Sequence, residues 1–208
     1  MSISQDVLKI FFKTPGLVNI RDSNSIEVQP GVFSSIYINL KSPLSDFKSR
    51  KRFCSYISKK ISNNADYICG IESGSNYFAS AVADLTRKKL IFYRKEIKKY
   101  NIKNRFVGIL PKANDHIVVV DDVVSSGNTI ASVVRELKKI GCRVEVIIIF
   151  SYCWDKVISK NLDVRIRSLV NAFQFIDYGL SRKLISEKNA EMIRDYVRRE
   201  EARVYKAK

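Results

Sequence analysis

The feature of this sequence that most constrains its fold is a unit that occurs twice: an apolar segment, a loop of small or polar residues, and an amphipathic helix. In the first unit, residues 66–71 run into the loop 72–75, and a helical pattern follows. In the second, residues 116–120 precede the loop 121–128 and the helical pattern of 129–141. Continuous apolar strands that alternate with helices predict an α/β fold whose parallel sheet is covered on both faces.

The remaining periodic segments supply more strands and the helices that cover them. We expect helices over residues 5–13, 44–61 and 186–203, and strand-like segments over residues 90–96, 144–152, 163–170 and 172–179. Residues 17–41 have the pattern of short strands around a Pro-Gly turn at positions 30 and 31. The chain has 208 residues, which suits one domain with a small cap.

Positive charge is the strongest bias in the composition, and it is concentrated in one segment. The formal net charge is +16, and residues 86–105 hold nine basic side chains against the single acid Glu96. That segment overlaps about twenty weakly periodic residues, and loops of such length are usually lids or binding loops. The pattern indicates an anionic partner: nucleic acid, a phosphorylated small molecule or a lipid surface.

Other features of the sequence exclude several classes of protein. No apolar segment approaches the roughly 18 residues of a membrane span, and the N-terminal residues lack the pattern of a secretory signal. The four cysteines and the single histidine, His116, are not spaced as a zinc site or a disulfide framework. We therefore expect a cytoplasmic protein with reduced thiols and no membrane partner.

The loop of the second unit carries the most distinctive chemistry. Asp121 and Asp122 are adjacent carboxylates at the end of an apolar strand, where like charges repel and resist desolvation. The hydroxyl-and-glycine loop that follows consists of Ser125, Ser126, Gly127, Asn128 and Thr129. Its hydroxyls and backbone N–H groups precede a helix, an arrangement that receives a phosphate at the positive end of the helix dipole. One ligand with a phosphate and a sugar diol would use both halves, because carboxylates accept hydrogen bonds from hydroxyls.

Each half of this loop also has a plainer interpretation. A helix cap needs only one Ser or Thr, and a pair of acids occurs in solvated turns. Neither interpretation explains the acids and the excess of hydroxyls together. In an open parallel sheet, ligands bind at the carboxyl ends of the strands, where the loop 72–75 of the first unit also falls. That loop is therefore a second candidate binding segment.

The segment IVVVDDVVSSGNT, residues 117–129, resembles the phosphoribosyl pyrophosphate motif of type I phosphoribosyltransferases. The segment YRKEIKKYN, residues 93–101, is similar to the Arg-Lys-Glu-x-Lys-x-His-Gly loop of the orotate phosphoribosyltransferases. GIESGS at 70–75 resembles the pyrophosphate loop of the family. QPGVFSSIYINL at 29–40, which contains Tyr37, resembles a degenerate form of its N-terminal segment.

The resemblance implies the type I phosphoribosyltransferase fold, a central, mostly parallel sheet flanked by helices with a small N-terminal hood. We expect residues 1–42 and C-terminal residues to form the hood, and residues 43–155 to form the core. The resemblance also implies transfer from phosphoribosyl pyrophosphate to a nucleobase, with Mg2+ as cofactor. It implies a homodimer in which the loop 94–105 reaches the neighbouring site.

The resemblance further assigns roles to single residues. Asp121 and Asp122 would hold the ribose hydroxyls and, mainly through substrate and water, the magnesium ion. The 5-phosphate would lie in the hydroxyl-and-glycine loop. Lys98 would be the catalytic lysine, with Arg94 and Lys95 as pyrophosphate ligands. The other candidate substrate contacts are Glu72, Ser73, Gly74, Ser75 and Tyr37.

The sequence departs from the family pattern in two places that bear on the choice of base. Tyr100-Asn101 stands where the family loop has His-Gly, and Lys156 is the first basic residue where an orotate-contacting arginine is expected. Orotate carries a carboxylate, whose natural partner is a guanidinium. We expect an orotate phosphoribosyltransferase and keep two alternatives: transfer to another base such as a purine, and a phosphoribosyl-pyrophosphate-sensing regulator that binds nucleic acid. Charge concentrated in the candidate catalytic loop argues against nucleic-acid binding.

Overall fold

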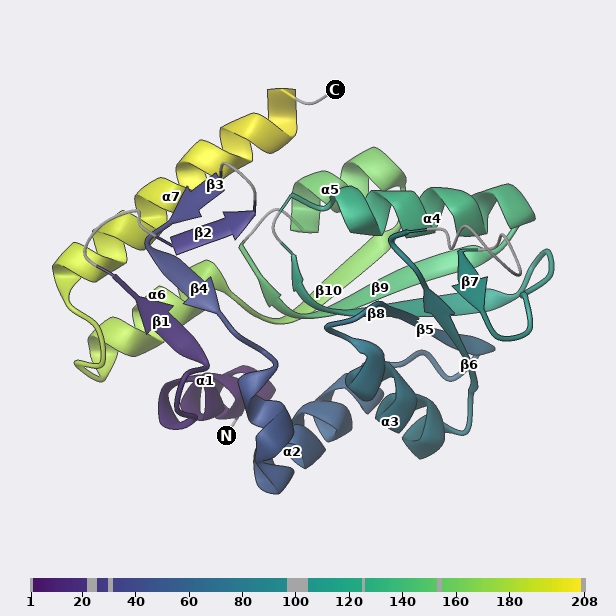
Figure 1. The fold of residues 1–208 in the computed structure, drawn as a ribbon, viewed down its shortest axis with the longest axis horizontal. Helices are drawn as coiled ribbons and strands as arrows, with labels where there is room; N and C mark the ends of the chain where they lie inside the picture. The colour runs from purple at the N-terminus through teal and green to yellow at the C-terminus, as the bar shows by residue number, and fades with distance from the viewer. Residues whose placement is uncertain are drawn as a thin grey trace.

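The centre of the molecule is a six-stranded sheet in the order β10-β9-β8-β5-β6-β7 (Figure 1). This computed structural model describes residues 2–21, 26–29, 32–96, 105–124, 126–152 and 155–206; for residues 28, 29, 32 and 202–206 the description covers the backbone alone. The strands are β5 (Tyr67–Ile71), β6 (Lys89–Tyr93), β7 (Phe106–Val107), β8 (His116–Val124), β9 (Arg143–Ser151) and β10 (Arg165–Asn171). Every neighbouring pair is parallel except β6 with β7. The predicted α/β fold with a mostly parallel sheet is confirmed.

Helices cover both faces of this sheet. Figure 1 shows α4 (Asn128–Ile140) and α5 (Asp155–Leu162) on one side, and α2 (Phe47–Ser58) and α3 (Asn76–Thr86) on the other. The central strand β8 is buried from His116 to Val120, which explains its continuous apolar run. The apolar face of α4 is buried, and the helix ends at Gly141, whose positive φ of 93° favours glycine.

Smaller elements gather at one end of the sheet. The antiparallel pairs are β1 (Val18–Ile20) with β4 (Ile36–Ile38), and β2 (Ile26–Gln29) with β3 (Val32–Ser34). The last helices are α6 (Ala172–Ser181) and α7 (Glu187–Lys206), and α7 runs beside the small strands in Figure 1. The short strands expected within residues 17–41 are therefore present.

The division into a hood and a core stays a prediction. It assigns α1 (Ile3–Lys13) to the hood, but this helix packs into the main core. The ring of Phe11 lies 6.2 Å from that of Phe53 on α2 and 5.7 Å from that of Phe150 on β9, measured between centroids. Leu17, Ile36, Ile38 and Leu40, which follow α1, belong to the same buried cluster, so this segment also contributes to the core packing.

The strand predicted over residues 172–179 is wrong, because this segment forms the helix α6. Its aromatic and β-branched residues favour a strand locally. The buried side chains, however, are Ala172, Phe175, Ile176 and Gly179, which share one helical face. Asn171 begins the helix with a capping box, since its side chain accepts from the backbone N–H of Gln174 and the Gln174 side chain accepts from the backbone N–H of Asn171. Capping chemistry and tertiary burial outweigh strand propensity here.

Two predicted boundaries also shift. The helix expected over 44–61 begins later, because η1 (Ser42–Ser45) precedes it and Asp46 caps α2 by accepting from the Ser49 N–H at 2.8 Å. The loop expected to start at Asp121 starts later as well, because β8 continues to Val124. The reason is that β9 is equally long and still pairs with β8 there. None of the described helices is long and apolar enough to cross a lipid bilayer.

Candidate active site

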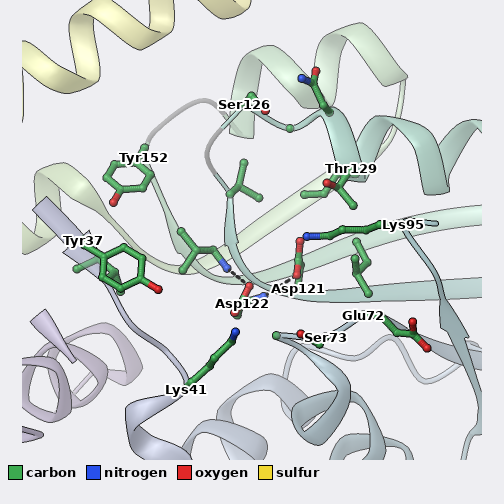
Figure 2. Close-up of a pocket in the computed structure, with 18 of the residues that line it drawn as sticks. Tyr37, Lys41, Glu72, Ser73, Lys95, Asp121, Asp122, Ser126, Thr129 and Tyr152 are labelled. Carbon is green, nitrogen blue, oxygen red and sulfur yellow. Dashed lines mark hydrogen bonds between the residues drawn. The ribbon is translucent and has the colours of Figure 1, made fainter. Parts of the chain in front are cut away.

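A cleft of about 390 Å³ lies at the carboxyl ends of the central strands (Figure 2). It brings together eleven of the predicted site residues: Tyr37, Glu72, Ser73, Gly74, Lys95, Asp121, Asp122, Ser126, Gly127, Asn128 and Thr129. Segments that are far apart in the sequence thus share one cavity. Their roles in binding a substrate stay predictions, but all eleven residues lie where a single ligand could contact them.

The two aspartates face the cleft because β8 is longer than its neighbour β5. Pairing between the two strands ends at Val120, opposite Gly70, while pairing with β9 continues. The Asp122 backbone N–H donates to Asp121 Oδ1 at 3.0 Å, and the Val123 N–H donates to Asp122 Oδ1 at 2.8 Å. These local bonds fix both carboxylates beside the space that β5 leaves open.

The electrostatics of the aspartate pair are unfavourable. Burial, and then the charge of Asp122, raise the pKa of the Asp121 carboxyl well above its usual value. The backbone N–H of Asp122 and the nearby charge of Lys95 act in the opposite direction. Figure 2 shows the Lys95 amine next to Asp121. A ligand that donates hydrogen bonds or carries positive charge would therefore bind favourably to these two carboxylates.

The turn after β5 approaches the aspartates closely. A β-carbon at Gly74 would lie 2.8 Å from the Asp122 carboxyl carbon, so any larger residue there would have to displace that carboxylate or the turn. Ser75 is fully buried, and its hydroxyl accepts from the Ile71 N–H at 2.7 Å and donates to the Ile71 carbonyl at 2.8 Å. The Ser75 side chain therefore holds the turn in shape, while Ser73 and Gly74 line the cleft.

The loop before α4 has the features of an anion site. Gly127 precedes the helix with a positive φ of 75°, and no side chain caps the helix N-terminus within the described residues. The first N–H groups of α4 are thus left for a ligand. A β-carbon at Gly127 would also lie 3.0 Å from Ile158 Cγ1 of α5. Backbone conformation and close packing both require glycine at this position.

The ends of the predicted lid are held together. The Arg94 N–H donates to the Arg105 carbonyl at 2.7 Å, and Arg105 Nη1 donates to the Lys95 carbonyl at 2.8 Å. Arg105 also forms an ion pair with Glu136 of α4 at 3.3 Å. The Arg94 side chain is paired with Glu72, with 3.5 Å between Nε and Oε1. Arg94 therefore meets a carboxylate at the edge of the site, whereas Lys95 enters the cleft.

Several predictions fall outside the described residues. These are the catalytic role of Lys98, the phosphate contact of Ser125 and the departure at Tyr100-Asn101. The free cysteines among the described residues are Cys54, Cys69 and Cys142, in line with reduced thiols. Burial raises the pKa of the Cys54 thiol to about 11, which keeps it protonated and unreactive.

Sequence reasoning missed the opposite wall of the cleft, which includes Lys41, Tyr152 and Tyr196. The Tyr152 and Tyr196 rings meet edge to face with centroids 5.4 Å apart, so helix α7 contacts the end of β9. Burial raises the pKa of the Tyr152 phenol. The only local signal for Lys41 is its position just after the alternating segment that forms β4. Nothing local points to Tyr196, because its role depends on how α7 packs.

The chain belongs to the phosphoribosyl transferase domain family, whose model matches residues 41–181. Within that family, it is similar to curated orotate phosphoribosyltransferases. It is 32% identical over 111 residues to the one from Methanocaldococcus jannaschii, an alignment that covers 53% of this chain and 62% of the relative. It is 29% identical over 173 residues to the one from Staphylothermus marinus, which covers 82% of this chain and 84% of the relative. The chain spans about three fifths of the first relative and most of the second.

Solved structures share the fold. Orotate phosphoribosyltransferase from Aeropyrum pernix superposes with a TM-score of 0.72 at 21% identity and covers 86% of this chain and 99% of that one. Leishmania donovani UMP synthase superposes with a TM-score of 0.76 at 20% identity and covers 94% of this chain and 42% of that one. The fold is therefore that of the type I phosphoribosyltransferases, as the sequence predicts.

Proposed function

We propose that this chain transfers the phosphoribosyl group of phosphoribosyl pyrophosphate to orotate, giving orotidine monophosphate and pyrophosphate for pyrimidine nucleotide synthesis. The observation that carries the proposal is one cleft, in a phosphoribosyl transferase domain, that joins the β8 carboxylates to the N-terminus of α4, which no described side chain caps. The names of the similar proteins support orotate as the base.

The substrate would extend across the cleft from α4 to the turn after β5. Its 5-phosphate would lie against the N–H groups that follow Gly127, with the Ser126 and Thr129 hydroxyls beside it. Its ribose hydroxyls would donate to Asp121 and Asp122, which relieves the electrostatic cost of this pair. Its pyrophosphate would lie on the turn at Ser73 and Gly74, within reach of Lys95.

In the reaction, the bond between ribose C1 and the pyrophosphate oxygen breaks, and its electron pair leaves with the pyrophosphate. A nitrogen of the base forms the new bond to C1, and the proton that this nitrogen carried is released. Positive charge grows on the sugar while negative charge grows on the leaving group, so catalysis is mainly electrostatic. Asp121 and Asp122 stabilise the sugar, and Lys95 faces the departing anion.

Magnesium belongs to this proposal as an ion that accompanies the substrate. No group of three or more metal-ligating side chains occurs in the part of the chain that the structure describes. Magnesium keeps several waters, however, and is usually bound by one or two carboxylates together with substrate phosphates. Asp121 and Asp122 fit that mode. When bound, the ion would neutralise charge on the pyrophosphate.

The loop between Arg94 and Arg105 would act as a lid that brings Lys98 to the leaving group. Support comes from the held ends of this loop, which would limit its movement to the segment between them. A lid would also exclude water from the reacting sugar. We further propose a homodimer in which this loop reaches the neighbouring site, and a cytoplasmic location, to which the free thiols are suited.

The experiment that tests this function offers the purified protein phosphoribosyl pyrophosphate, magnesium and a mixture of orotate, uracil, adenine and hypoxanthine. We expect consumption of orotate and release of one pyrophosphate for each orotidine monophosphate. Consumption of a purine instead would move the assignment to another base. Consumption of none, with no binding of phosphoribosyl pyrophosphate, would reject transferase activity.

A further inference from the structure

The cleft contains two cations among its described lining residues, Lys41 and Lys95. Lys95 lies beside Asp121, and its positive charge lowers the pKa of that carboxyl. Figure 2 shows Lys41 on the other side of the cleft, with its amine directed toward Asp122. The two lysines therefore approach the aspartate pair from different sides of the cleft.

The backbone fixes Lys41 in this position. It follows β4, in which Ile36 and Ile38 are buried and Tyr37 between them is exposed. The Lys41 N–H donates to Asn39 Oδ1 at 3.2 Å, and the Lys41 carbonyl accepts from the Leu44 N–H at 3.0 Å. Among the described residues, no carboxylate forms an ion pair with the Lys41 amine. A lysine whose backbone is held and whose charge is unpaired is well placed to bind an anionic group.

The location of Lys41 matches the part of the cleft that the proposed substrate leaves open. With the 5-phosphate on α4 and the pyrophosphate on the turn after β5, the base must approach C1 from the remaining wall. That wall presents Tyr37, Ile38 and Tyr152 together with Lys41. Aromatic and apolar side chains suit a flat heterocycle, and an ammonium suits a carboxylate on its edge.

We propose that Lys41 is the specificity-determining residue of the base site, and that it selects an anionic base by pairing with its carboxylate. This inference rests on the proposed function, and it gives a partner for the orotate carboxylate in a chain without an arginine in the expected place. An ammonium is a point charge and not a planar fork, so it requires less exact alignment than a guanidinium. Uracil, which lacks the carboxylate, would leave Lys41 unpaired.

The test compares binding of orotidine monophosphate and uridine monophosphate, which differ by that carboxylate alone, to the wild type and three variants by calorimetry. We expect the wild type to prefer orotidine monophosphate. Lys41→Ala should reduce that preference about tenfold or more, as loss of a charge-assisted hydrogen bond does, and leave uridine monophosphate binding unchanged. Lys41→Arg should retain most of the preference. Lys139→Ala, which removes an exposed lysine of α4, should behave as the wild type.

Other results overturn the inference. A preference that survives in Lys41→Ala would show that another group reads the carboxylate. An equal loss for both nucleotides, or weaker binding of inorganic pyrophosphate, would place Lys41 at the sugar or the leaving group. Failure of the proposed function is distinguishable, because the wild type would then bind neither nucleotide and transfer to no base.

Discussion

The α-carbon of Gly74 lies so close to the Asp122 side chain that a β-carbon at position 74 would come within 2.8 Å of the carboxyl carbon. This approach links the turn after β5 to the end of β8, two segments about fifty residues apart. In the proposed complex, the turn holds the pyrophosphate and the aspartate holds the ribose. Their contact therefore sets the spacing between the pyrophosphate-binding and ribose-binding parts of the site.

Gly74→Ala is expected to disturb both stability and activity. The added methyl group must displace the Asp122 carboxylate or the turn, at a cost of about 1–3 kcal/mol typical of overpacking. Turnover should fall more than the folded fraction explains, because the aspartate no longer lies where the ribose needs it. Urea unfolding and steady-state kinetics on the same samples would measure the two effects.

A double-mutant cycle provides the control for this prediction. In an Asp122→Ala background the obstructing carboxylate is gone, so Gly74→Ala should cost much less stability there than in the wild type. A coupling of about 0.5–3 kcal/mol is expected for residues in contact. If the two substitutions were additive, the close approach would not be the cause of the loss.

Asp121→Asn should make the protein more stable at neutral pH. The pKa of Asp121 is raised in the folded state well above its ordinary value, so the folded state binds the proton more tightly than the unfolded state does. Wild-type stability from this group therefore falls as the pH rises from the unfolded pKa through the folded pKa. The amide of Asp121→Asn does not titrate, so the variant does not lose this stability as the pH rises.

Urea unfolding of both proteins between about pH 4 and about pH 8 measures this effect. The advantage of Asp121→Asn should grow as the pH rises from the unfolded pKa through the folded pKa, while activity is lost. An advantage that is independent of pH would mean that the carboxylate is not destabilised in the fold.

Arg105→Ala tests whether the held ends of the loop matter for turnover. The substitution removes the hydrogen bond to the Lys95 carbonyl and the ion pair with Glu136. We expect a stability loss of about 1 kcal/mol. We also expect a clear fall in kcat, because Lys98 would be positioned less well. Arg135→Ala, which removes an exposed arginine of α4, is the matched control. Equal turnover in the two variants would remove the loop ends from the mechanism.

The sequence predicts the central sheet well because its signals there are local and redundant. A continuous apolar run, a small-residue loop and a helical face agree with one another around β8 and α4. The helix α6 shows where this reasoning fails, since Phe173 and Ile176 favour a strand while a capping box and the buried face of a helix decide the outcome.

The residues of the candidate site also differ in whether the sequence predicts them. Asp121, Asp122 and Gly127 lie in one short motif, so their chemistry can be recognised from spacing alone. Lys41 and Tyr196 reach the cleft only because β4 and α7 pack beside the sheet ends, and no motif in the sequence marks them. Residues that are brought in by tertiary packing are those that a local pattern cannot identify.

In the proposed complex, the β8 aspartates hold the ribose of phosphoribosyl pyrophosphate while the α4 N-terminus holds its 5-phosphate. Calorimetric titration of the wild type and Asp122→Asn with phosphoribosyl pyrophosphate, ribose 5-phosphate and inorganic pyrophosphate, each with magnesium, tests it most directly. We predict weaker binding of both sugar phosphates to the variant and a smaller loss for pyrophosphate, which the aspartates contact only through magnesium. Unaltered binding of both sugar phosphates, or a wild type that binds neither, would contradict it.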